Sequence, residues 1–310
     1  MANNELDELT VIIVSYNTRD LTLKCLETLF QNTSRTKFKA VLFDNASHDG
    51  SADAVARHFP QVELIRSDEN LGFAKANNIV AEKAETEWLL LLNPDTEVHK
   101  HAIDNLLKFS RQHPEAGITG GRTVFPDGSL NIASCWQKIT LWSMFCHAFG
   151  LTTLFPQTNL FNPEAMGGWK RDTVRHVDIV SGCFFMIRKK LWSDLGGFNL
   201  KYVMYGEEAD LCLRAKKQGY SPMITPDAQI MHLVGASSDQ RLDKTLLILK
   251  AKITLIIDHW PRLTTSIGLN LMKLYVFIRC ARSKSFSSAQ EETYWQSLWQ
   301  RRKEWMQGYN

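Results

Sequence analysis

Short apolar runs alternate with amphipathic stretches along the first 125 residues. The apolar runs are uncharged and rich in β-branched residues, which is typical of buried strands, and the stretches between them repeat apolar residues at helical spacing. Strands are predicted at residues 9–15, 40–43, 61–65 and 88–92, and helices at 18–32, 51–58 and 73–84. This alternation predicts an α/β fold with a mostly parallel, Rossmann-like sheet flanked by helices, in which ligands bind beyond the carboxyl ends of the strands.

The pattern loosens after residue 125. Residues 126–170 show little periodicity and are predicted to form loops over the site. The remaining predicted elements are a strand at 177–188, helices at 189–195 and 207–218, short strands at 223–225 and 230–232, and helices at 240–259, 262–281 and 285–307. The last of these helices is rich in tryptophan and amphipathic, and Pro261 separates the two before it.

The chain has 310 residues, of which 44 % are hydrophobic and 22 % charged. This is the composition of a globular protein and excludes disordered, collagen-like and coiled-coil chains. The net charge of +3 is too close to zero to predict nucleic-acid binding. Residues 241–310 nevertheless carry 12 Lys or Arg and 5 Asp or Glu, a net charge of +7. Residues 1–240 carry the remaining 24 Lys or Arg and 28 Asp or Glu, a net charge of −4. A basic tail on an acidic body predicts contact with an anionic partner.

Six cysteines are scattered without the spacing of a metal site or a disulfide framework, so we expect reduced thiols in a cytoplasmic protein. The first eight residues are polar and acidic, unlike a signal peptide. The longest apolar stretch, residues 263–280, is interrupted by Asn270, Lys273 and Arg279, and we therefore expect no membrane span.

Polar residues follow three of the predicted strands. Ser15, Tyr16 and Asn17 follow the first, residues 44–50 (DNASHDG) the second, and residues 93–96 (NPDT) the fourth. Such residues also form turns and helix caps, so each exit alone is weak evidence for a site. Together they predict a polar site at one edge of the sheet. There Asp44 would accept hydrogen bonds from a nucleobase or ribose, and Asp95 with a diphosphate would hold Mg²⁺ or Mn²⁺.

Three further groups have both a structural and a functional interpretation. The acidic cluster Glu207, Glu208 and Asp210 opens a helix, where it complements the helix dipole or supplies a general base. His232 is either a structural residue or a partner of Asp95. The glycine turn of residues 70–78 (NLGFAKANN) precedes a helix and would cradle a phosphate beside Lys75. Because GxGxxG is absent, a dinucleotide site is disfavoured.

In this order the motifs resemble the family-2 glycosyltransferases, an inverting class with the GT-A fold. The resemblance runs from Val11 to about Gly235, through the segments VIIVSYN (11–17), FDNASHDG (43–50), NLGFAKANN (70–78), LLNPD (91–95) and MYGEEADLCLR (204–214). The NPD and DLCLR versions look most like the bacterial rhamnosyltransferase-like branch, which builds O-antigen, capsule and cell-wall polysaccharides.

The resemblance implies a role for each matching residue. Val14 and Tyr16 would contact the base and ribose, Asp44 the imide of uracil or thymine, and Lys75 the donor phosphates. Asp95 would bind the metal, with His232 as a second ligand. The nucleotide-sugar site would comprise Val14, Ser15, Tyr16, Asp44, Asn45, Gly72, Lys75, Asn93, Pro94, Asp95, Asp178 and Gly182. Glu208 would deprotonate an acceptor hydroxyl for a direct displacement with inversion, and Glu207 and Asp210 belong to the same catalytic segment.

This chain departs from the family pattern at two positions. Asn93 replaces an Asp of the metal motif, and Glu208 replaces the catalytic Asp, so the register between Glu207 and Glu208 stays open. The expected activity is transfer of L-rhamnose from dTDP-rhamnose to a bacterial surface polysaccharide or its lipid-linked precursor. A UDP-hexose donor is the alternative, and a nucleotidyltransferase or an inert sugar-nucleotide or glycan-binding homologue is less favoured.

The resemblance implies a catalytic domain over residues 1–240, with a nucleotide-binding half to about 125 and an acceptor half beyond it, and a C-terminal helical extension over 241–310. The last helix places Trp295, Leu298 and Trp299 near one face. It is either an interfacial membrane helix or a helix packed on the catalytic domain or a partner subunit. A lipid-linked acceptor favours peripheral attachment at the inner face of the cytoplasmic membrane, and a homo-oligomer is left open.

Overall fold

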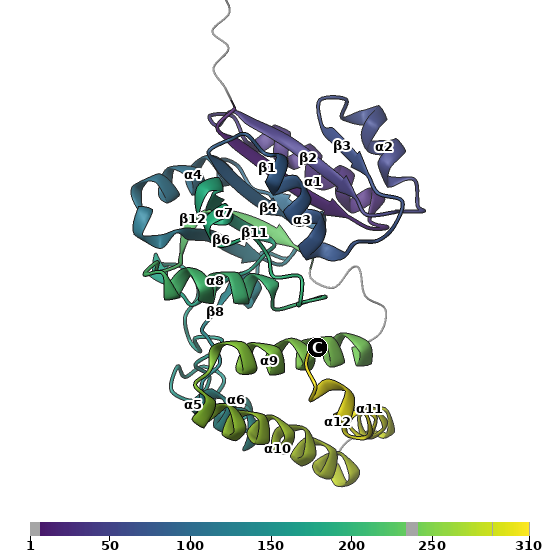
Figure 1. The fold of residues 1–310 in the computed structure, drawn as a ribbon, viewed down its shortest axis with the longest axis vertical. Helices are drawn as coiled ribbons and strands as arrows, with labels where there is room; N and C mark the ends of the chain where they lie inside the picture. The colour runs from purple at the N-terminus through teal and green to yellow at the C-terminus, as the bar shows by residue number, and fades with distance from the viewer. Residues whose placement is uncertain (1–6, 234–240, 287, 310) are drawn as a thin grey trace, which may run out of the picture. The chain divides into compact units, whose positions relative to one another are not determined.

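The computed structural model describes residues 7–233, 241–286 and 288–309 (Figure 1). They group into two units. The first comprises the described parts of residues 1–136, 170–200 and 208–237, and the second those of 137–169, 201–207 and 238–310. Two segments expected in the main domain, 137–169 and 201–207, thus belong with the C-terminal helices. Gly235, where the sequence resemblance ends, and the first six residues lie outside the described residues.

The first unit is built on one large sheet, and its main strands follow the order β3-β2-β1-β4-β11-β6-β12-β5. These strands are β1 (Leu9–Ser15), β2 (Phe38–Asp44), β3 (Glu63–Arg66), β4 (Trp88–Leu92), β5 (Thr96–Val98), β6 (Ile118–Val124), β11 (Phe184–Arg188) and β12 (Met223–His232). The first four are parallel, β11 runs antiparallel between β4 and β6, and β12 is parallel to β6. Two short strands extend the sheet, β7 (Leu130–Asn131), which pairs with β6, and β9 (Arg175–His176), which pairs with β12. A separate pair is formed by β8 (Cys135–Trp136) and β10 (Ile179–Val180).

Helices cover both faces of the sheet because alternate residues of each buried strand point to opposite sides. In β1, Val11 and Ile13 join a core formed with α1 (Arg19–Asn32), α2 (Ser51–His58) and α4 (Ala102–Gln112). On the other face, α3 (Gly72–Lys83) and α7 (Lys189–Asp194) meet around the ring of Phe198. A mostly parallel sheet between helices confirms the predicted fold class. A 3₁₀ turn at Pro114–Ala116 precedes β6, and another at Ile132–Ser134 follows β7.

The structure corrects two predicted strands. The strand expected at 177–188 is broken at residues 181–183 into β10 and β11. The two short strands expected at 223–225 and 230–232 are one strand, β12, with an irregular register between Thr225 and Gln229. Pro226 lies in that irregularity, where the missing N–H of proline can be tolerated.

The second unit is helical. It contains α5 (Leu141–Ala148), α6 (Leu151–Leu154), α9 (Arg241–His259), α10 (Arg262–Phe286), α11 (Ala289–Gln300) and α12 (Arg302–Trp305). The prediction of loops over 126–170 was therefore wrong for α5, α6 and the short strands β7 and β8, and α5 is the longest of these elements. This helix is apolar on nearly all sides and lacks the contrast that periodicity detects, although Thr140 and Ser143 form a reciprocal capping box at its start. Its Met144 packs into the core of the unit with α9 and α10.

The tryptophans of the tail pack inside this unit. Leu298 and Trp305 are fully buried, and the ring of Trp295 meets that of Tyr275 edge-on at 6.0 Å. The predicted helix at 285–307 is in fact the end of α10, α11 and α12. The tail therefore packs on α9 and α10 of its own unit, and its contact with a membrane or a partner subunit stays a prediction. No helix within the described ranges is long and apolar enough to cross a membrane.

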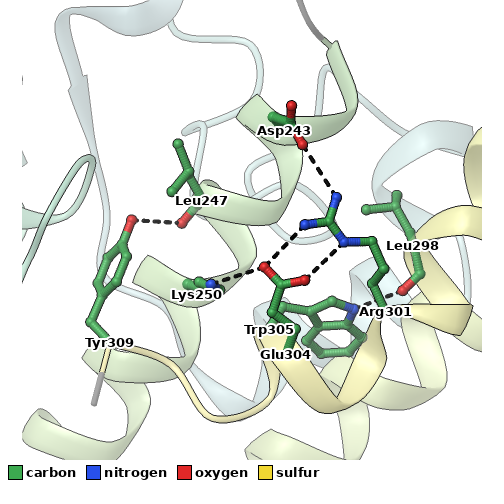
Figure 2. A network of polar contacts seen from close by, with 8 residues as sticks. All are labelled: Asp243, Leu247, Lys250, Leu298, Arg301, Glu304, Trp305 and Tyr309. Atoms are coloured by element: carbon green, nitrogen blue, oxygen red, sulfur yellow. Dashed lines mark hydrogen bonds and ion pairs between the residues drawn. The ribbon is translucent and has the colours of Figure 1, made fainter.

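Ion pairs join the end of the chain to α9 (Figure 2). Arg301 contacts Asp243 at 3.2 Å and Glu304 at 2.8 Å, and Lys250 lies 3.0 Å from Glu304. These side chains are largely exposed, so each pair contributes at most about 1 kcal/mol. Complete burial of a side chain as large as that of Trp305 contributes about 3 kcal/mol, and it is therefore the stronger attachment.

Candidate active site

Asp44 closes β2 beside Ser15 at the end of β1, and its side chain is buried. One carboxylate oxygen, Oδ2, accepts a hydrogen bond from the backbone N–H of Ser47 at 3.2 Å. The other, Oδ1, is buried and has no hydrogen-bond partner among the described residues. A buried oxygen without a partner is costly, and a ligand that donates an N–H or O–H would remove that cost. Asp44 is therefore suited to bind a donor group of a ligand.

Ser15 and Asn45 shape the loops around Asp44. The Ser15 hydroxyl lies 3.0 Å from those of Thr18 and Thr22 in a buried cluster. The Asn45 amide donates to the side chain of Asn70 and accepts from the N–H of Leu71. Ser15 thus fixes the turn from β1 into α1, and Asn45 joins the exit of β2 to the turn before α3. Val14 is buried beside them, whereas Tyr16 is exposed.

Gly72 and Lys75 begin α3 after this turn. Gly72 has φ of +76°, a conformation that favours glycine, and its N–H donates to the Asn70 side chain at 2.9 Å. Lys75 lies in the first turn of the helix and is exposed. The glycine turn into a helix is therefore present as predicted, and whether Lys75 contacts phosphate stays a prediction.

Asp95 and His232 are brought together by strand pairing. His232 of β12 lies opposite Thr96 of β5, and its Nε2 is 3.2 Å from Oδ1 of Asp95. Both side chains are almost buried. Burial disfavours the charged imidazole, but contacts with Cys183 and Asp95 outweigh this effect and raise the pKa of His232 to about 10.

The Asp95–His232 pair fits one half of a divalent metal site. The carboxylate of Asp95, in the turn before β5, is a suitable ligand for Mg²⁺ or Mn²⁺. The imidazole of His232 binds a metal only in its neutral form, so an ion such as Mn²⁺ bound here would displace its proton. No group of three or more His, Cys, Asp or Glu side chains within the described part of the chain could hold a metal ion by itself. An ion bound here would therefore need further ligands from a substrate, as diphosphates provide.

The turn at residues 181–183 joins these pieces. The carbonyl of Cys183 accepts a hydrogen bond from the N–H of Asn93 at 3.1 Å, which fixes the exit of β4. A Cβ placed on Gly182 would lie 3.4 Å from the ring of Phe73 in α3 and 3.9 Å from Cβ of Glu208. Glu208 at the start of α8 (Glu207–Lys217) thus lies close to the turn that holds the Asn93–Asp95 segment.

The backbone before α8 adopts an unusual conformation. Tyr205 and Gly206 both have left-handed φ, +67° and +91°. Such a conformation costs roughly 1 kcal/mol or more at a non-glycine residue and is often found at functional sites. It leads directly into Glu207, which is buried, and Glu208, which is partly exposed. Glu208 is the more accessible of the two for a reacting hydroxyl.

Two other predicted acidic residues form ion pairs. Asp210 Oδ2 lies 2.8 Å from Nε of Arg214, whose guanidinium also donates to the carbonyls of Leu195 and Gly197. Asp178 pairs with Lys216 at 2.5 Å. Both carboxylates are nearly buried, so these contacts suit a role in shaping the site, and their predicted roles in catalysis and sugar binding stay predictions.

Tyr309 joins the segment that precedes Glu207 to α9, and Figure 2 shows its contact with Leu247 of α9. Its hydroxyl donates to the carbonyl of Leu247 at 3.2 Å and to that of Met204. Burial raises the pKa of Tyr309, so the hydroxyl remains protonated and able to donate. Tyr309 cannot be identified from the sequence, because no sequence pattern connects it with residue 204.

Replacing Tyr309 should loosen this segment. We expect Tyr309→Phe to increase amide hydrogen exchange of residues 203–207 about fivefold, the equivalent of one lost hydrogen bond. Tyr294→Phe is the matched control, because it removes a hydroxyl that contacts Thr245 at 2.7 Å in the same unit. Equal exchange of residues 203–207 in both variants and the wild type would show that Tyr309 does not hold the segment.

All six cysteines are free and buried, which confirms the predicted thiols. Burial raises the pKa of Cys25 and Cys212 to about 12, so neither is a reactive thiolate. The cysteines belong to the core of the protein.

Comparison with known proteins places these features in a family. The model of "Glycosyl transferase family 2" matches residues 10–196, more than half of the chain. That range includes Asp44 and Asp95 and ends before α8 and His232. The roles of the acidic cluster and the histidine therefore rest on the sequence motif and the geometry.

Curated relatives support the same assignment. The chain is 29 % identical over 245 residues to the N-acetylglucosaminyl-diphospho-decaprenol L-rhamnosyltransferase of Mycobacterium tuberculosis, covering 73 % of this chain and 76 % of that protein. It is 29 % identical over 233 residues to the rhamnosyltransferase WbbL of Escherichia coli, covering 72 % and 82 %.

Solved structures share the fold. The mannosyltransferase PcManGT of Pyrobaculum calidifontis, in complex with GDP-Man and Mn²⁺, aligns with a TM-score of 0.58 and 16 % identity over 99 % of this chain and 85 % of that one. TarS 1–349 of S. aureus with UDP-GlcNAc aligns with a TM-score of 0.55 and 15 % identity, covering 98 % and 82 %. The family match, the relatives and the sheet with its polar edge agree: this chain is a glycosyltransferase that belongs to glycosyl transferase family 2.

Proposed function

We propose that this glycosyltransferase transfers a sugar from a nucleotide-diphosphate donor to an acceptor hydroxyl, with inversion at the anomeric carbon. The observation that carries the proposal is the arrangement around Gly182. The Asn93–Asp95 segment, His232 and Glu208 all lie at this turn, and the buried Oδ1 of Asp44 lies at the exit of a neighbouring strand. Donor recognition, phosphate binding and proton transfer would thus occur at one edge of the sheet.

Asp44 would recognise the nucleobase. Its Oδ1 accepts the N–H of a uracil or thymine imide, which supplies the partner that this buried oxygen lacks among the described residues. Val14 and Tyr16 would contact the base and ribose, and Lys75 in the first turn of α3 would face the diphosphate. Asn45, Ser15 and Gly72 support this half of the site by fixing its loops.

Asp95 and His232 would hold the divalent ion. A bound Mg²⁺ or Mn²⁺ neutralises the charge that develops on a diphosphate leaving group. Nε2 of His232 and Oδ1 of Asp95 lie 3.2 Å apart, close enough for both to bind one ion that displaces the imidazole proton. Asn93 is the neutral residue of the motif, so the protein would contribute a single carboxylate to the ion.

Glu208 would act as the general base. Its carboxylate takes the proton of the acceptor hydroxyl as the oxygen forms a bond to the anomeric carbon. The bond between that carbon and the phosphate oxygen breaks on the opposite side, and its electron pair leaves with the nucleotide diphosphate. Partial exposure of Glu208, in contrast to burial of Glu207, supports this choice of base.

dTDP-L-rhamnose is the proposed donor and a bacterial surface polysaccharide or its lipid-linked precursor the proposed acceptor. The names of the relatives in M. tuberculosis and E. coli support rhamnosyl transfer. A UDP-hexose is the alternative donor, since both nucleotides present the same imide to Asp44. A lipid-linked acceptor would bring the protein to the inner face of the cytoplasmic membrane from the cytoplasm.

A thermal-shift panel tests the donor site. We expect dTDP or UDP with Mn²⁺ to stabilise the wild type, by about 2.7 kcal/mol at 100 times the dissociation constant. Asp44→Asn should no longer be stabilised by the nucleotide, because an amide nitrogen or a weaker acceptor replaces the carboxylate oxygen. In Asp95→Asn, the stabilisation by nucleotide should no longer depend on Mn²⁺. GDP and CMP serve as nucleotides that lack this imide pattern.

Asp53→Asn is the matched control for these variants, because its carboxylate is exposed in α2 and pairs with Arg66. It should respond like the wild type. A wild type that no nucleotide stabilises would refute the donor site. Stabilisation without turnover of dTDP-rhamnose or a UDP-hexose would favour the inert homologue.

A further inference from the structure

The second unit carries a row of exposed and partly exposed aromatic rings on α5 and on the segments that follow α5 and α6. We define the aromatic patch as Trp142, Phe145, Phe149, Phe155 and Phe161. Neighbouring ring centroids lie between 4.6 and 6.2 Å apart, in the order Phe149, Phe145, Trp142, Phe161, Phe155. The rings therefore form one continuous surface.

The patch is open to solvent. Phe149 is 49 % exposed and Trp142 43 %, and the adjoining Leu154 and Leu160 are 69 % and 62 % exposed. Single exposed apolar side chains are ordinary on a protein surface, but a contiguous group of this size marks an interaction site. The patch is also held in place, because the indole N–H of Trp142 donates to the carbonyl of Leu160.

Arginines of α10 lie beside the patch, and the nearest acidic residue along the chain, Glu164, is buried and paired with Lys252. No Asp or Glu occurs between residues 128 and 163. From α10, Arg279 donates to the hydroxyl of Thr153 at 3.0 Å, and the Arg282 guanidinium would lie 3.8 Å from a Cβ placed on Gly150. Arg282 is exposed, so its charge is available to a partner.

From these observations we propose that the aromatic patch docks on the surface of an anionic lipid bilayer. Trp and Phe side chains insert at the boundary between headgroups and acyl chains, while Arg279 and Arg282 contact lipid phosphates. A second copy of this chain fits less well, because its patch would bring the same arginines together without an acidic partner. The proposal assigns membrane contact to residues 142–161, whereas the tryptophans of α11 and α12 are packed within the unit.

This binding does not depend on the proposed sugar transfer, although it would bring the protein to a lipid-linked acceptor. Its test therefore uses neither donor nor acceptor. Purified full-length protein is mixed with vesicles of phosphatidylcholine alone or of phosphatidylcholine with phosphatidylglycerol, and the bound fraction is measured by flotation. We expect binding to the anionic vesicles, and weaker binding as salt is raised.

Two variants test the two parts of the patch. Trp142→Ser combined with Phe149→Ser should weaken vesicle binding roughly tenfold or more, because it removes two inserting rings. Arg282→Gln should weaken binding to anionic vesicles by a smaller factor of roughly 5. Leu263→Ser is the matched control, because Leu263 is 89 % exposed on α10 outside the patch, and it should bind like the wild type. Circular dichroism checks that each variant is folded.

Three outcomes would overturn the proposal. The first is that the wild type fails to float with anionic vesicles, and the second is that the double variant binds the vesicles as well as the wild type does. The third outcome is that the Leu263→Ser control loses as much vesicle binding as the double variant. Light scattering after gel filtration is run on the same samples. A wild-type dimer that the double variant dissociates, together with no vesicle binding, would assign the patch to a second copy of the chain instead.

Discussion

Replacement of Glu208 by glutamine should lower kcat by roughly 100- to 10,000-fold, the usual contribution of a general base. The amide has nearly the same shape as the carboxylate but cannot take a proton from the acceptor hydroxyl. Donor binding should remain, because the Asp44 and Asp95 regions are unchanged. The measurement is steady-state transfer from dTDP-rhamnose or a UDP-hexose, combined with the thermal shift by nucleotide.

Glu207→Gln is the matched comparison, because the two residues are adjacent and open the same helix. We expect a much smaller decrease in kcat, since Glu207 is buried while Glu208 lies beside Gly182 at the turn that holds the Asn93–Asp95 segment. If Glu207→Gln abolishes transfer and Glu208→Gln retains it, the register of the base is shifted by one residue. If both variants are active, the base lies elsewhere.

Arg214→Met should lower the free energy of unfolding by about 3 kcal/mol, the usual cost of removing one partner from a buried ion pair. Arg214 contacts Asp210, whose side chain is only 4 % exposed, and it also binds the carbonyls of Leu195 and Gly197. Methionine keeps much of the apolar stem but supplies none of these hydrogen bonds. Urea unfolding followed by circular dichroism gives the change.

The control is Lys190→Met, which removes a cation from a pair of the same i, i+4 spacing with Asp194 on α7. Lys190 is 84 % exposed, so we expect a loss of at most about 0.5 kcal/mol. Equal losses in the two variants would mean that burial of Asp210 does not make its pair with Arg214 stronger. In that case the loop at 195–197 must be held by other contacts.

The strands and helices of the nucleotide-binding half could be predicted closely from the sequence. The predicted strand at 88–92 has the bounds of β4, and the predicted helix at 51–58 has those of α2. Both have local causes. An uncharged apolar run predicts the strand, and an amphipathic period bounded by turn residues predicts the helix. The prediction failed at α5, where an almost entirely apolar helix has no polar face that would show its period.

The candidate site residues could be identified from the sequence, but not their surroundings. Asp44, Asp95 and Glu208 follow from strand exits and from the family motif. That Asn45 binds Asn70, that Cys183 fixes Asn93, and that Arg214 reaches the carbonyls of Leu195 and Gly197 depends on contacts between different elements. Such partners are separated by up to about a third of the chain, and no local pattern specifies them.

The sequence by itself determined the α/β class, the family resemblance and the strand exits that bear the site, because these depend on periods of a few residues and on short motifs. Only the tertiary structure decided that His232 lies beside Asp95, that Tyr309 holds the segment before Glu207, and that Trp305 is buried while Trp142 is exposed. Both residues are tryptophan, so the residue type alone does not predict which of them is buried. What separates them is whether other helices cover them, and that depends on packing between residues far apart in the chain.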